Sequence, residues 1–89
     1  MTHYLKITEE HFRNVLKGIK TFEIRKNDRD FQVGDSLVLR LYKNYKYTGD
    51  NITVKITYIL KDAFKYGLIP EYAILSFTEI QYEVKRLDI

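Results

Sequence analysis

The residues best suited to chemistry lie where a helical hydrophobic pattern gives way to an alternating one. Lys20, Thr21, Glu23 and Arg25 follow one another across this boundary. In a strand, Thr21, Glu23 and Arg25 share one face, with alternate residues roughly 6.5–7 Å apart. Gly18 permits a tight junction before the strand, so Lys20 is expected to swing toward the same face. We therefore predict a small cluster of two cations and one carboxylate.

Such a cluster suits recognition of a phosphate or of a base edge. Arg25 offers a planar fork of donors, and Lys20 offers a point charge. Glu23 either holds Arg25 in position or accepts hydrogen bonds from the amino group of a base. A cross-strand salt-bridge cluster on a solvated face is the alternative interpretation. If the site is catalytic, Lys20 and Glu23 are the candidates, with Glu23 as the general base and the two cations stabilising charge on phosphate.

A short helix and several strands are predicted to position these side chains. Thr8 is a candidate N-cap, and the apolar residues that follow it at helical spacing are Phe12, Val15, Leu16 and Ile19. Gly18 is a candidate C-terminal stop. Alternating apolar residues predict strands over residues 4–7, 21–25, 37–42, 52–60 and 72–80.

Further details of these strands follow from the same alternation. Gly49-Asp50 is predicted as a turn, and residues 61–71 as an irregular or partly helical segment. The longest strand is expected to show one apolar face, made of Ile52, Val54, Ile56, Tyr58 and Leu60. The tail, residues 81–89, is expected to extend the last strand or to form another edge strand.

Length and composition limit the number of domains and the kinds of metal site that the chain can form. The chain has 89 residues, which predicts one domain over residues 1–89. It contains no cysteine, so disulfides and thiolate metal sites are excluded. His3 and His11 are too far apart to indicate a zinc site and are expected at the surface or as caps. We predict neither a metal nor a cofactor.

Charge and hydropathy indicate partner and location. A net charge of +3 favours anionic partners, with RNA or a nucleotide leading, although it is also an ordinary solubility charge. Lys26 and Arg29 are predicted to widen the positive surface, with solvated surface charge as the alternative for each. No signal-peptide region and no apolar run of roughly 20 residues is present, so we expect a cytoplasmic bacterial or phage protein without a membrane partner. Exposed edge strands allow a homodimer.

The segment from Gly18 to Arg25 resembles the GxKxxExR signature of ASCH domains, in the PUA-like superfamily. Gly18, Lys20, Glu23 and Arg25 match its four named positions, and residues 31–35, FQVGD, resemble the turn into the next strand. The chain is most similar to a small, uncharacterised subfamily of bacterial and phage ASCH-like domains. The resemblance implies an α+β fold: a PUA-like, small mixed or antiparallel β-barrel of about five or six strands with one or two short helices.

The resemblance also implies an RNA- or nucleotide-binding cleft beside the motif, with Tyr66 in a segment that covers the cleft mouth. Some relatives hydrolyse acetylcytidine, and others are linked to RNA cleavage. Lys20 matches the lysine of the acetylcytidine amidohydrolases, but Glu23 stands where they have the catalytic threonine, and residues 52–60 supply no acid. We therefore expect a non-catalytic binding module using Lys20, Thr21, Glu23, Arg25, Lys26, Arg29 and Tyr66. A nucleic-acid-related hydrolase and a phage or host regulatory protein acting through protein contacts are the alternatives.

Overall fold

A computed structural model describes residues 1–83 of the chain. These residues form a curled sheet of five strands with one α-helix beside it. The elements are β1 (Thr2–Ile7), α1 (Glu9–Leu16), β2 (Phe22–Lys26), β3 (Ser36–Lys43), β4 (Lys46–Leu60), the 3₁₀ helix η1 (Ala63–Tyr66) and β5 (Tyr72–Glu83). This is a small α+β fold dominated by its sheet, as the sequence predicts. The prediction for residues 84–89 lies outside the described residues.

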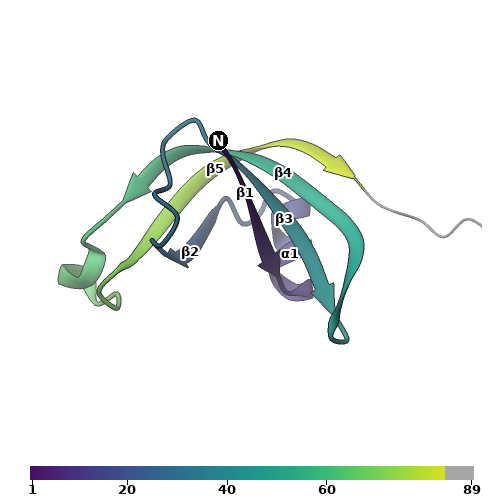
Figure 1. Cartoon of the computed structure of the whole chain (residues 1–89), viewed down its shortest axis with the longest axis horizontal. Coiled ribbons are helices and arrows are strands. Elements are labelled where there is room, and N and C mark those ends of the chain that lie inside the picture. The colour runs from purple at the N-terminus through teal and green to yellow at the C-terminus, as the bar shows by residue number, and fades with distance from the viewer. Residues whose placement is uncertain (84–89) are drawn as a thin grey trace, which may run out of the picture.

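The strand order across the sheet is β1-β3-β4-β5-β2. β1 and β3 run parallel, and the other neighbouring pairs are antiparallel, so the sheet is mixed. Figure 1 shows the sheet bent into an arch, with the long strands β4 and β5 running over its top. β1 and β2 are therefore the two edges of a half-barrel.

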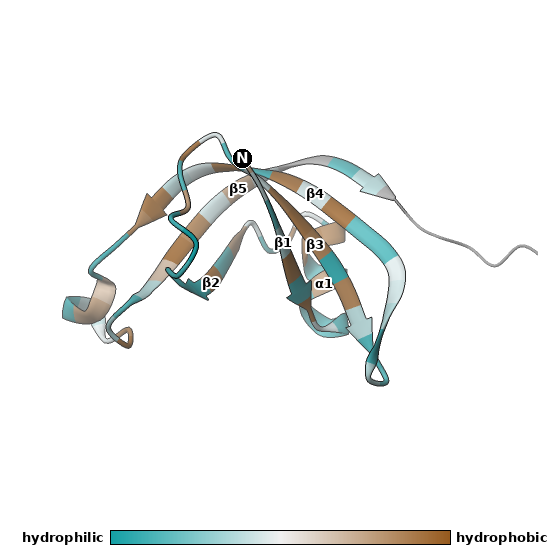
Figure 2. Cartoon of the chain, viewed as in Figure 1, coloured by the Kyte–Doolittle hydropathy of each residue, from teal (hydrophilic) through white to brown (hydrophobic). Residues whose placement is uncertain are grey.

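Apolar residues on one face of β1, β3, β4 and β5 fill the concave side of this arch. Alternation along these strands puts most second side chains inside, and Figure 2 shows the resulting hydrophobic bands on β3, β4 and β5. Helix α1 adds Phe12 and Val15 to the core. Phe31, from the segment between β2 and β3, is among the largest fully buried side chains. The core thus joins α1, the sheet and this connecting segment.

The predicted turn at Gly49-Asp50 is wrong. The chain reverses at Asn44 and Tyr45, which both have positive φ (54° and 66°), between the paired residues Lys43 and Lys46. A two-residue hairpin loop of this kind needs left-handed backbone at both central positions, which asparagine tolerates. Gly49 instead lies within β4, where the ladder with β3 shifts register, and glycine accommodates its φ of +97°.

The predicted side-chain positions of Tyr58, Leu60 and His3 are also wrong. Tyr58 is 59% exposed, because the β4–β5 register shifts between Ile56 and Tyr58 and turns the later residues over. Ile59 then packs against the core in place of Tyr58. His3 is buried rather than at the surface, since its Nε2 lies 2.8 Å from Oδ2 of Asp35.

Candidate ligand-binding cleft

Strand β2 turns its charged side chains toward the inside of the arch. In its ladder with β5, Glu23 lies opposite Leu75 and Arg25 opposite Ala73, and opposed residues share a face of the sheet. Leu75 and Ala73 are core residues, so Glu23 is only 5% exposed. Phe22, on the other face of β2, is 40% exposed. The predicted alternation is therefore present, and the charged face is the inner one.

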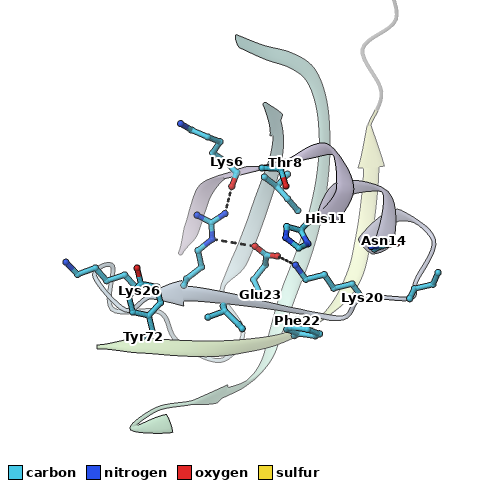
Figure 3. A pocket seen from close by; sticks show the side chains of 13 residues that line it. Lys6, Thr8, His11, Asn14, Lys20, Phe22, Glu23, Lys26 and Tyr72 are labelled. Atoms are coloured by element: carbon cyan, nitrogen blue, oxygen red, sulfur yellow. Dashed lines mark hydrogen bonds and ion pairs between the residues drawn. The ribbon is translucent and has the colours of Figure 1, made fainter. Parts of the chain in front are cut away.

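Glu23 lies between two cations. The Lys20 ammonium donates to Glu23 Oε2 at 2.8 Å, and Arg25 Nε lies 3.5 Å from Oε1 (Figure 3). All three side chains are largely withdrawn from solvent, with exposed fractions of 14% for Lys20, 7% for Glu23 and 27% for Arg25. The structure thus brings together the three residues that the sequence places in one cluster, which we call the charged triad.

Gly18 directs Lys20 into the triad. Helix α1 gives way to a left-handed residue at Gly18, with φ of +77°, a conformation that glycine adopts at little cost. The amides of Ile19 and Lys20 then both donate to the carbonyl of Asn14 at 3.0 Å, which turns the chain back toward β2. The junction that the sequence predicts is therefore formed.

Two arginines bridge the open edges of the half-barrel. Arg25 Nη2 donates to the carbonyl of Lys6, and Arg29 Nη1 donates to the carbonyl of Tyr4 at 2.7 Å. Both acceptors belong to β1, whereas Arg25 lies on β2 and Arg29 lies shortly after it. Guanidinium groups thus contact β1 where the sheet has no direct β1–β2 pairing; we call these two contacts the arginine seam.

A cleft of about 840 Å³ opens beside the triad. Because β2 is an edge strand, all five of its residues border the cleft, together with residues from β1, α1, the α1–β2 turn and β5. Its lining is Lys6, Ile7, Thr8, His11, Asn14, Ile19, Lys20, Phe22, Glu23, Ile24, Arg25, Lys26 and Tyr72.

Positive charge is concentrated in this cleft. Four of the lining residues are lysine or arginine, against one carboxylate, whereas the whole chain has 15 cations and 12 acids. The rest of the lining is largely apolar or aromatic, including Phe22, Ile24 and Tyr72. Among the side chains that the structure describes, no group of three or more is suited to holding a metal ion. The cleft therefore suits an organic anion with a ring or other apolar part.

The sequence-predicted site residues fall into two groups. Lys20, Glu23, Arg25 and Lys26 line the cleft. Thr21 is exposed beside it, with its carbonyl accepting from the Phe77 amide at 3.0 Å.

The other two predicted residues lie apart from the cleft lining. The Arg29 guanidinium belongs to the arginine seam, and Tyr66 lies on η1 with 74% of its surface exposed. Ligand contact by Thr21, Arg29 and Tyr66 stays a prediction.

Sequence reasoning missed one wall of the cleft. Thr8, His11 and Asn14 line it from α1, and their spacing of three residues is the signal that identifies them as one face. Thr8 is the N-cap, yet its side chain makes no capping hydrogen bond, so its hydroxyl is not committed to the helix end. This row adds a hydroxyl, an imidazole and an amide opposite the triad.

Comparison of the sequence with known families places the protein in a class without an assigned activity. The profile of DUF3850, a domain of unknown function, matches residues 2–77, and the chain belongs to that family. It is also 36% identical, over 55 residues, to the "Uncharacterized 12.9 kDa protein in GpA 3'region" of Escherichia phage P2. This match covers 62% of the chain and 50% of the relative, so the chain aligns with half of that protein's length. The expected link to phage proteins is thus confirmed.

Proposed function

We propose that this domain binds RNA or a nucleotide in the cleft beside the charged triad, without catalysing a reaction. The observation that carries the proposal is the inward-facing triad of Lys20, Glu23 and Arg25 at the wall of a cationic cleft. Partly desolvated cations attract phosphate more strongly than solvated ones, since less intervening water screens the charges. The aromatic and apolar lining suits a base.

The fold and the motif support the same proposal. The four positions shared with the GxKxxExR signature lie at the α1–β2 junction and on β2, beside the cleft. We propose that the half-barrel is PUA-like, of the ASCH kind, and that Lys20, Glu23, Arg25 and Lys26 hold the ligand. Within residues 1–83, no helix is long and apolar enough to cross a membrane. A cytoplasmic location and a homodimer stay predictions, the second of which sedimentation analysis tests.

Hydrolysis is the weaker candidate because of how Glu23 is engaged. Its Oε2 accepts from Lys20, and its Oε1 faces Arg25, so both oxygens already neighbour a cation that the carboxylate helps to hold. A general base needs a free oxygen within hydrogen-bond reach of the proton that it takes. We therefore favour Glu23 as the group that positions the two cations.

A binding screen tests this function. The purified protein is titrated at low salt with nucleosides, nucleotides, acetylcytidine and short single-stranded RNAs, and binding is followed by thermal shift and calorimetry. We expect one ligand class to stabilise the parent and Lys55→Ala, whose exposed side chain lies outside the cleft lining, but not Lys20→Ala. Absence of binding across the panel would contradict the proposal and favour a protein partner. A new product from any ligand would favour the hydrolase.

A further inference from the structure

The two ends of the cleft differ in chemistry. One end carries Lys26, and the other carries Phe22, His11 and Asn14, with Glu23 between them (Figure 3). Arg25 directly precedes Lys26 on β2. A ligand that fills such a cleft must itself have one anionic end and one planar, hydrogen-bonding end. A nucleotide with a terminal phosphate has this polarity.

Free donors are available at the cationic end. Arg25 uses Nη2 for the Lys6 carbonyl and Nε for Glu23, which leaves further N–H groups of its five. In the described part of the chain, the Lys26 ammonium has no ion-pair or hydrogen-bond partner. By contrast, the Lys6 ammonium lies 4.3 Å from the centre of the Tyr42 ring. Arg25 and Lys26 are therefore the groups best placed to take a phosphate.

The other end offers a surface for a ring. Phe22 is 40% exposed and borders the cleft from an edge strand, and the Lys20 ammonium lies 5.4 Å from the centre of its ring. Asn14 and His11 lie on α1, on the side of β2 that carries the triad, with groups that both donate and accept hydrogen bonds. Stacking on an aromatic ring together with an amide contact is a common way to hold a nucleobase.

The surroundings of the cationic end limit how far a phosphate chain extends. A second depression, of about 420 Å³, borders the first at Lys26 and Tyr72. Its other lining residues include the three carboxylates Asp28, Asp62 and Glu71, against the single cation Lys61. Successive phosphates would be repelled there, so the phosphate at Arg25 and Lys26 is expected to end the ligand.

We propose that the cleft recognises a nucleotide by its terminal phosphate, held by Arg25 and Lys26, with the base against Phe22 and the α1 row. This inference rests on the proposed function and names its ligand class. The ligand is either a free nucleoside monophosphate or the phosphorylated end of an RNA strand, because both present one base and one terminal phosphate.

Calorimetry at low salt tests the inference. The probes are the four common ribonucleosides, their 5′-monophosphates, and tetranucleotides with a 5′-phosphate, a 3′-phosphate or hydroxyl ends. We expect a terminal phosphate to tighten binding about tenfold, the effect of one charge-assisted contact. Lys26→Gln should remove most of this increment and so weaken the phosphorylated probes more than the nucleosides, whereas Phe22→Ala should weaken nucleoside and nucleotide alike. Lys55→Gln is the matched control.

The outcomes separate the two proposals. Binding of free monophosphates but not of phosphorylated tetranucleotides would identify the free nucleotide as the ligand, and the reverse would identify the RNA end. If hydroxyl-ended probes bind as tightly as phosphorylated ones, the terminal-phosphate inference is wrong and the proposed function stands. An equal effect of Lys26→Gln on nucleosides and nucleotides would also overturn the inference. If no probe binds, both proposals fail.

Discussion

Glu23 lies directly opposite Leu75 in the β2–β5 ladder, so a carboxylate occupies the face of the sheet that elsewhere holds the core. Its charge is matched there by Lys20 and Arg25. A buried charge without partners is costly, which makes the triad a unit whose members depend on one another.

Glu23→Gln should lower the free energy of unfolding by about 2 kcal/mol, the scale of a lost hydrogen bond to a charged group. The reason is that Lys20 and Arg25 would remain as neighbouring, partly buried cations without their carboxylate. Urea denaturation followed by circular dichroism measures the change.

The double variant Lys20→Met with Glu23→Leu is the control for this prediction. It removes one charge of each sign and replaces the pair by apolar side chains, so it should cost less than Glu23→Gln alone. If Glu23→Gln were as stable as the parent, the carboxylate would not hold the two cations in place.

Acid should destabilise the protein through Asp35. The hydrogen bond from His3 lowers the pKa of Asp35 from 3.8 to about 2. Burial opposes this shift, and hydrogen bonds from the Gln32 amide and the Met1 amino group add to it. Because the folded pKa is the lower one, this stabilisation is present above about pH 4 and is lost as pH falls from 4 toward 2. Melting temperatures of the parent and Asp35→Asn should therefore differ at pH 5 and converge near pH 2. A constant difference across this range would contradict the assignment.

Gly18→Ala should destabilise the protein by about 1 kcal/mol, the cost of a left-handed backbone for a residue with a Cβ. No atom lies within 4 Å of the position that the Cβ would take, so the cost comes from the backbone alone. Gly18→Asn should cost less, since asparagine tolerates this conformation. Thermal unfolding of the two variants measures both effects, and equal losses would indicate a steric rather than a conformational cause.

Local patterns predicted the parts of this structure that depend on neighbouring residues. The helix, the turn at Gly18 and the alternation in β2 follow from spacing and backbone preference, and all three are present. The triad was predictable for the same reason, because its lysine, glutamate and arginine lie within six residues of one another along the chain. Side-chain periodicity is a local property, and it persists in β2, where the ladder with β5 keeps one register throughout.

Long-range register decided the parts that the sequence did not predict. Tyr58 continues the apolar alternation of β4 in the sequence, but a bulge opposite β5 turns it outward. His3 shares the buried face of β1 with Leu5 and Ile7, where Asp35, which is distant in sequence, accepts its hydrogen bond. The α1 wall of the cleft, with His11, likewise depends on the curl of the whole sheet, which no local pattern encodes.

Comparing the two arginines of the seam distinguishes the contribution of a guanidinium group to structure from its contribution to ligand binding. Arg25 and Arg29 both donate to β1 carbonyls, but only Arg25 also lines the cleft. Replacing either by lysine removes the planar fork, so both variants should speed amide hydrogen exchange in β1. Nucleotide affinity should fall about tenfold for Arg25→Lys, as one charge-assisted contact is weakened, and should stay within about twofold for Arg29→Lys.

Calorimetry and hydrogen exchange on the same two variants provide both measurements. Normal exchange in β1 with weakened binding in Arg25→Lys would assign that side chain to the ligand alone. Equal losses of affinity in the two variants would show that Arg29 also contacts the ligand, as its place in the sequence predicts. Both contacts of the seam would then act in binding as well as in holding β1.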